Sequence, residues 1–159
     1  MGTECLINNL LFIFMKKGFT LIELTIIFSI IAVLSVIGLS VSIDYNRTQI
    51  VNSAYEELKT TLNSAKSRAS SQRKPVACTG TLSGYQVFIE QERNKYHLRA
   101  VCPNLVSLNT VPLPQNIIFD SGPTFFFPTL IGGATGGTVT LTGYNKNKTI
   151  TVDSDGNIK

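Results

Sequence analysis

The feature that most constrains this chain is a run of twenty residues, 24–43, that contains no charged side chain. As an α-helix this run would be about 30 Å long, which matches the apolar thickness of a lipid bilayer. The run is too long for the apolar part of a secretory signal peptide, and no small-x-small cleavage site follows it. No later stretch is comparable, so the sequence predicts one membrane-spanning segment within residues 19–43.

Basic residues on one side of the run predict its orientation. Lys16 and Lys17 lie shortly before it, and basic residues tend to stay on the cytoplasmic side of a membrane. The N-terminus is therefore expected in the cytoplasm, and the residues after about 44 in a periplasm-like or extracellular space. The part of the chain after Val41 carries twelve Lys and Arg against eight Asp and Glu, a net charge of +4. Such a charge permits contact with anionic partners without requiring it.

The cysteines are divided between the two sides of the membrane run. Cys78 and Cys102 fall in the exported part, whereas Cys5 precedes the run. Exported cysteines in an oxidising compartment tend to pair. The sequence therefore predicts a disulfide between Cys78 and Cys102, and two buried free thiols are the alternative.

The residues that lead into the run, KKGFTLIEL at positions 16–24, form an unusual motif. A carboxylate such as that of Glu23 is costly at the edge of a bilayer and needs a reason to be there. The stretch resembles the prepilin signature of type IV pilins and type II secretion pseudopilins, and the resemblance is close over residues 16–41. The alternative interpretation is a plain signal anchor with a chance glutamate.

The resemblance implies processing and assembly. In that family a membrane aspartyl peptidase cuts after the glycine, here Gly18, and N-methylates the new first residue, here Phe19. The acid, here Glu23, pairs with the amino terminus of a neighbouring subunit, so that two charges costly in lipid become one tolerable pair. Residues 1–18 would be the leader. Because leaders in this family are short, we expect translation to start at Met15 and residues 1–14 to be a start-site error, with Met1 as the alternative start.

A second helical pattern follows the membrane run. Apolar residues recur at three- and four-residue steps between residues 51 and 69, most charged residues lie on the opposite face, and Pro75 ends the pattern. Since no proline occurs between residues 19 and 74, the sequence predicts one helix from about 20 to 73. Its half at 19–43 is the transmembrane segment, and its half at 44–74 is amphipathic.

Residues 75–159 change to short alternating runs separated by turn residues, which predicts an antiparallel β domain. The expected strands are 76–79, 85–91, 96–102, 116–119, 124–127, 138–142 and 149–153, with 157–159 as a last edge strand. One long helix on an antiparallel sheet is an α+β arrangement, the pilin fold. The segments 137–141, 149–152 and 155–159 are similar to the end of the GspH/FimT minor pilin group.

Candidate catalytic and metal-binding residues are few. His97 is the only histidine, and no second ligand or nucleophile lies near it in the sequence, so we interpret it as a strand residue. Asp153-Ser154-Asp155-Gly156 resembles the start of a calcium loop but lacks the later ligands, so a turn is favoured. The sequence predicts no catalytic residue, no metal site and no cofactor, and hence a protein that is not an enzyme.

The basic residues support a further alternative. They form three groups, at 66–74, at 93–99, and at Lys146, Lys148 and Lys159 near the C-terminus. Some FimT-like minor pilins bind DNA through a Gly-Arg-x-Arg tail. This chain has Gly156-Asn157-Ile158-Lys159 there, one cation in place of two arginines, so ordinary solvated lysines are favoured over DNA contact.

The sequence thus predicts a minor pilin or pseudopilin of a type II secretion pseudopilus or a type IV pilus. Its expected partners are other pilins or pseudopilins in a helical filament, prepilin peptidase, the inner-membrane assembly platform and inner-membrane lipid. It would be a single-pass protein of the bacterial inner membrane with its C-terminal domain in the periplasm. The alternative is a FimT-like DNA-binding minor pilin for DNA uptake.

Overall fold

The computed structural model describes residues 20–130 and 132–159, without the side chains of residues 36–41. One long helix, α2 (Leu21–Ser70), precedes seven strands and the short 3₁₀ helix η1 (Gln91–Arg93). The strands are β1 (Gly84–Glu90), β2 (Lys95–Val101), β3 (Leu105–Pro112), β4 (Ile117–Phe119), β5 (Thr124–Pro128), β6 (Gly137–Gly143) and β7 (Lys146–Val152). The chain divides into two compact units between Asp44 and Tyr45. We call the second unit, Tyr45–Lys159, the head domain.

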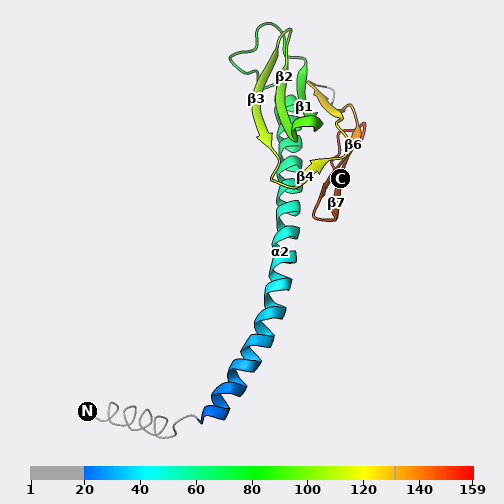
Figure 1. Cartoon of the computed structure of the whole chain (residues 1–159). Coiled ribbons are helices and arrows are strands. Elements are labelled where there is room, and N and C mark those ends of the chain that lie inside the picture. The colour runs from blue at the N-terminus through cyan, green and yellow to red at the C-terminus, as the bar shows by residue number, and fades with distance from the viewer. Residues whose placement is uncertain (1–19, 131) are drawn as a thin grey trace, which may run out of the picture. The chain divides into compact units, whose positions relative to one another are not determined.

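Within the head domain, the C-terminal half of α2 runs alongside β1, β2 and β3 (Figure 1). The helix buries the apolar face that its sequence predicts, through Val51, Ala54, Leu58, Leu62, Ala65 and Ala69. All the buried hydrophobic side chains of the described residues lie between Val51 and Val152. The core of the head domain is therefore built entirely from its own residues, and the α+β pilin fold predicted from the sequence is confirmed.

The helix ends at Ser70, a few residues earlier than the sequence predicts. Gln72 adopts a left-handed backbone conformation with φ 51°. Its N–H donates to the carbonyl of Ala69, and the N–H of Arg73 donates to the carbonyl of Arg68. These two bonds form a Schellman cap, which satisfies carbonyls that the end of a helix leaves unpaired. The cap stops the helix before Pro75 could.

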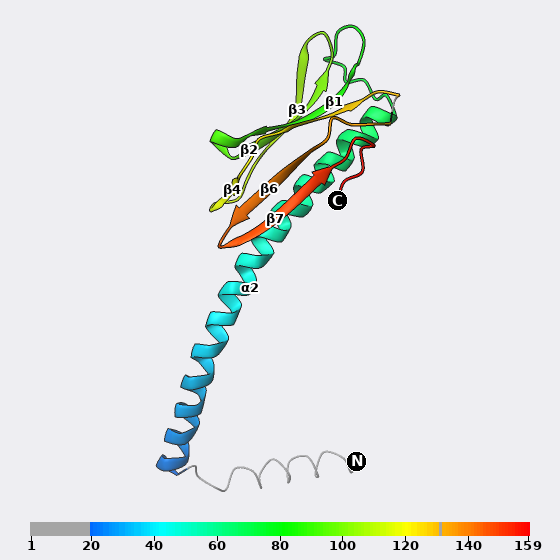
Figure 2. The same ribbon diagram turned by 90° about the vertical axis from the view of Figure 1, so that its right-hand side faces the viewer.

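The strands form two antiparallel sheets instead of the single sheet expected. One sheet has the order β3-β2-β1-β5 and the other the order β4-β6-β7. Figure 2 shows the β6–β7 hairpin beside the same part of α2, where the ammonium of Lys66 donates to the carbonyl of Gly156 at 2.8 Å. The helix thus contributes to the core beneath both sheets.

The predicted strand at 76–79 is wrong, and the strand β3 was missed. Residues 76–79 form turns and irregular backbone, and Val76 is fully exposed. β3 pairs with β2 along its length except for an irregularity opposite Leu98 and Arg99. Asn109 and the register shift interrupt the alternation of apolar residues in β3, which explains why its pattern was not recognised.

The other six predicted strands coincide with β1, β2, β4, β5, β6 and β7, within a few residues at each end. The connection between β1 and β2 has Asn94 in the left-handed conformation. The β6–β7 turn has Tyr144 and Asn145 both at positive φ, as a type I′ hairpin requires. The predicted last edge strand is reduced to a bridge between Val152 and Ile158.

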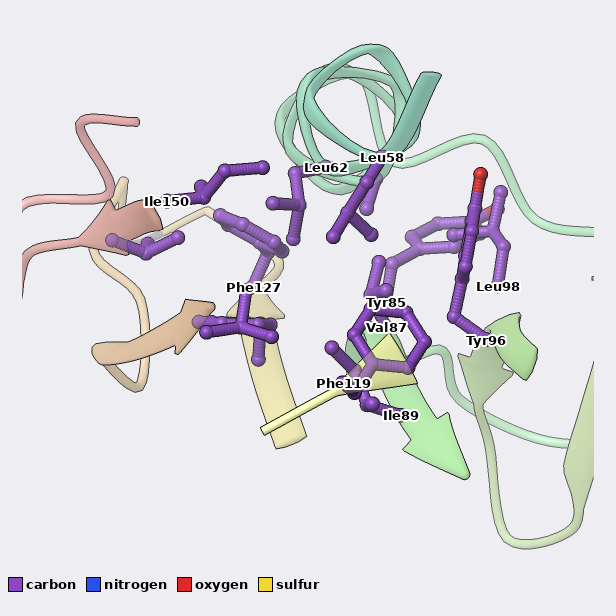
Figure 3. Close-up of a cluster of buried hydrophobic side chains, with 14 of the residues drawn as sticks. Leu58, Leu62, Tyr85, Val87, Ile89, Tyr96, Leu98, Phe119, Phe127 and Ile150 are labelled. Atoms are coloured by element: carbon purple, nitrogen blue, oxygen red, sulfur yellow. The ribbon is translucent and has the colours of Figure 1, made fainter. Parts of the chain in front are cut away.

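The core lies between α2 and the strands. Figure 3 shows Leu58 and Leu62 pointing from the helix toward side chains of both sheets. The first sheet supplies Tyr85, Val87 and Phe127, and the second supplies Phe119 and Ile150; every one of these side chains is almost completely buried. Tyr96 and Phe119 meet edge to face, with ring centroids 6.3 Å apart. Large aromatic groups therefore join the two sheets and the helix into one core.

Within the described residues, no helix combines the length and the hydropathy that crossing a membrane would need. The predicted membrane segment includes residues 36–41, whose side chains lie outside those described.

Candidate functional site

The predicted processing residues Gly18 and Phe19 lie outside the described residues, whereas Glu23 lies in the first turn of α2. The hydroxyl of Thr20 accepts the backbone N–H of Glu23 at 3.3 Å, and the carbonyl of Thr20 accepts that of Leu24 at 3.1 Å. Thr20 is therefore the N-cap of the helix. Thr and Glu at this spacing also have the sequence of a capping box, of which the structure shows the half that Thr20 makes.

The helix after Glu23 carries apolar side chains all around its axis. The exposed ones include neighbouring pairs such as Ile26 and Ile27, and Ile30 and Ile31, and successive residues of an α-helix point about 100° apart. A helix that is apolar on every side is normally buried in a larger core or in a membrane. This stretch is thus suited to surroundings that are apolar on all sides, with Glu23 as the one acid of its first turn.

The predicted cysteine pair lies at one end of the head domain. A disulfide joins Cys78 and Cys102, whose Cα atoms are 5.9 Å apart, and both residues are buried. The side chain of Asn104 reinforces the link, since it accepts from the hydroxyl of Thr79 at 2.9 Å and donates to the carbonyl of Ala77 at 3.4 Å. The irregular segment after α2 is therefore fixed to the end of β2.

The acidic stretch near the C-terminus is a closed turn. One carboxylate oxygen of Asp153 accepts the backbone N–H groups of Asp155 at 3.1 Å and of Asn157 at 2.8 Å. The hydrogen bond from the Asn157 backbone is the main cause that lowers the pKa of Asp153 below its ordinary value, and nearby Lys159 contributes. Over the described residues, no group of three metal-ligating side chains is found.

The three lysines considered for DNA contact do not form one group. Lys146 begins β7, whereas Lys159 pairs with Thr151 near the opposite end of that strand. The ammonium of Lys159 lies 3.8 Å from the carboxylate of Asp153. Lys148 lies over the ring of Tyr55, 5.8 Å from its centroid. The structure therefore separates the tail lysine from the two hairpin lysines.

A protein-family model, described as type II transport protein GspH, matches residues 54–156. The chain belongs to the GspH family. Searches of curated proteins and of solved structures returned no match. The GspH match covers both sheets and the buried helix face from Ala54 onward, so it supports a type II secretion pseudopilin on grounds independent of the motif at residues 16–24.

His97 in this GspH-family chain links three strands on the outer face of the first sheet. Its Nε2 lies 3.0 Å from a carboxylate oxygen of Glu90, and its Nδ1 lies 2.8 Å from the hydroxyl of Thr110. The hydrogen bond from His97 is the main cause that lowers the pKa of Glu90. His97 is half-buried in a strand, as expected. Its two partners lie 7 and 13 residues away, on β1 and β3, and the prediction did not include β3.

Proposed function

We propose that this GspH-family chain is a pseudopilin or minor pilin that is processed at Gly18, methylated at Phe19 and assembled into a filament through α2. The observation that carries the proposal is the family match combined with a helix that is apolar on every side and has one acid in its first turn. Soluble proteins do not leave such a helix in water. A filament or a membrane provides the apolar surroundings that this helix needs.

The role of Glu23 follows from the cost of isolated charges. Cleavage after Gly18 would leave an ammonium on Phe19, next to the apolar run. A charged group in a membrane or an apolar filament core is expensive by itself, and a pair of opposite charges is much less so. Glu23 of one subunit is therefore a suitable partner for the amine of the next. The pair also fixes the axial register of the two helices, as single polar residues do in coiled coils.

The proposal places the chain in the bacterial inner membrane before assembly, with the head domain in the periplasm. The uncharged run at 24–43 and the preceding Lys16 and Lys17 support this location and orientation. The partners would be prepilin peptidase, the assembly platform and the other pseudopilins of the filament. The Cys78–Cys102 disulfide is consistent with an oxidising compartment.

The test is the chemical state of the N-terminus. The full chain is expressed with and without prepilin peptidase, and the purified protein is examined by intact-mass spectrometry and N-terminal fragmentation. We expect a chain that begins with N-methylated Phe19 when the peptidase is present. A Gly18→Glu variant should remain uncleaved, and a Gly137→Ala variant, changed far from the cut at a position where a Cβ meets nothing nearer than 3.5 Å, should be processed normally. Retention of Lys16 and Lys17 in peptidase-containing cells would refute the proposal.

A further inference from the structure

Most cations of the head domain already have a local partner. Arg93 lies 3.4 Å from the Glu90 carboxylate, and Lys95 also acts on Glu90 electrostatically. Other cations lie over aromatic rings, pair with Asp153 or donate to a carbonyl; these are Arg47, Lys59, Lys66, Arg99, Lys148 and Lys159. Among the described residues, the exception is a group at the C-terminal end of α2 that has no carboxylate, ring-face or carbonyl partner, formed by Arg68, Arg73 and Lys74. We call this group the cap cations.

The cap cations line a hollow of about 220 Å³ whose other walls are Pro75, Tyr85 and Leu108. In the part of the chain that the structure describes, no Asp or Glu lines this hollow. The side-chain partners of Arg68 are neutral: its Nε lies 3.4 Å from the hydroxyl of Ser64, and its guanidinium is hydrogen-bonded to the phenol of Tyr85. Three positive groups thus converge on a small cavity without a negative group to balance them.

The backbone holds these groups in place. The Schellman cap fixes the chain from Arg68 to Arg73. The hydroxyl of Tyr85, from β1, donates to the carbonyl of Arg73 and fastens the turn to the sheet. Burial raises the pKa of Tyr85, while Arg68 and Arg73 act in the opposite direction. The phenol therefore stays neutral at physiological pH and does not supply the missing negative charge.

We propose that the cap cations form a binding site for a carboxylate from an acidic segment of a partner protein. Two guanidinium groups suit a planar oxyanion, because each can donate two parallel hydrogen bonds to it. The apolar walls formed by Pro75 and Leu108 suit the aliphatic stem of a Glu side chain. The site lies in the head domain, and the proposal does not depend on how the N-terminus is processed.

The size and isolation of the hollow favour a protein carboxylate over a nucleic acid. A nucleic-acid strand presents phosphates at regular intervals, and proteins that bind it follow the backbone with a continuous basic groove. Here the basic group is confined to one small cavity, and the other cations named above are occupied by aromatic rings, carboxylates or a carbonyl. A single acidic side chain fits this arrangement, with its neighbours outside the cavity.

The test uses the full chain in detergent micelles and measures fluorescence anisotropy of a labelled hexaglutamate peptide. A labelled hexaglutamine peptide reports binding that does not need carboxylates, and a labelled oligothymidine of twelve nucleotides reports phosphate binding. The variant R68Q/R73Q removes two cap cations. Its matched control, R93Q/K95Q, removes the same charge from the β1–β2 turn. Urea unfolding of each variant establishes that it is folded.

We expect the wild-type chain to bind hexaglutamate at low salt, and R68Q/R73Q to weaken that binding at least tenfold. R93Q/K95Q should change it less than twofold. If R68Q/R73Q does not fold, the exposed Lys74→Glu change replaces it and should weaken binding at least fivefold. Equal losses in the two double variants would overturn the proposal, since only net charge would then matter. Tighter binding of oligothymidine, lost in R68Q/R73Q, would overturn it in favour of a nucleic-acid phosphate.

Discussion

Removal of the Cys78–Cys102 disulfide tests how the head domain is stabilised. The two cysteines are 24 residues apart. In the chain-entropy model, a cross-link of this span lowers the conformational entropy of the unfolded chain by about 11.6 cal/mol/K. At 25 °C this raises the free energy of unfolding by about 3.5 kcal/mol. Domains of ordinary size have only about 5–15 kcal/mol of total stability. The C78S/C102S variant is therefore expected to lose a large share of the stability of the head domain.

The assay is equilibrium urea unfolding of residues 45–159, whose buried hydrophobic core is complete within that unit. With a denaturant slope of about 2 kcal/mol/M, a loss of about 3.5 kcal/mol lowers the midpoint by about 1.7 M. Wild-type protein treated with a reductant is the matched control, and its midpoint should fall to that of C78S/C102S. Equal midpoints for the oxidised wild type and C78S/C102S would refute the cross-link argument.

Three further outcomes are expected for the head domain, each measured by urea unfolding. Leu62→Ala should cost about 2–5 kcal/mol because Leu62 is fully buried between α2 and the strands; a loss below 1 kcal/mol would contradict that packing. Gly84→Ala should lower the free energy of unfolding by about 1–3 kcal/mol, because the added Cβ would overlap the carbonyl of Phe127. Gly137→Ala is the control and should stay near wild type, because the Cβ added there meets no atom nearer than 3.5 Å. Folding lowers the pKa of Asp153 below its ordinary 3.8. The ionised carboxylate therefore stabilises the folded domain fully above pH 3.8, and this contribution disappears as the pH falls through the pKa of the folded state. Asp153→Asn should therefore flatten the acid limb of the stability profile, and an unchanged limb would refute this assignment.

The sequence predicted the helix face and most strands because both patterns are local. The spacing of Leu58, Leu62 and Ala65 is set by the period of the helix, and each strand that alternates cleanly shows a period of two. The pairing of strands into two sheets is not local. β4 pairs with β6 through residues that are 22 to 26 positions apart in the sequence, and the choice depends on which aromatic side chains fit beneath α2. A periodic pattern within one segment does not indicate which other strand that segment pairs with.

The functional features divide in the same way. Gly18, Phe19 and Glu23 are contiguous enough to be recognised as a motif. The cap cations come from the helix end and the turn after it, so the sequence shows their charge. The hollow, however, also needs Tyr85 and Leu108 from two strands, and one of those strands was not predicted. The sequence also does not indicate that His97 contacts Glu90 and Thr110, because contacts between strands can be predicted only once the strand register is known.

The two roles available to Glu23 can be separated by comparing substitutions. A capping box accepts Gln as well as Glu, because the box uses a hydrogen bond rather than a charge. Neutralising the amine of a neighbouring subunit requires the charge itself. Thr20 already caps the helix by accepting the N–H of Glu23 at 3.3 Å, a bond that any residue at position 23 can donate. Removal of the Glu23 side chain should therefore leave the start of the helix largely intact.

We accordingly expect Glu23→Gln and Glu23→Ala to reduce incorporation into sheared filaments by similar factors, each at least tenfold, by quantitative immunoblot. Thr20→Ala, which removes the cap and keeps the charge, serves as the reverse control and should retain most of its incorporation. Because every buried hydrophobic side chain of the described residues lies beyond position 50, none of these changes should shift the urea midpoint of the head domain. If Gln restores incorporation where Ala does not, the hydrogen bond rather than the charge is what assembly uses, and the pairing argument is wrong.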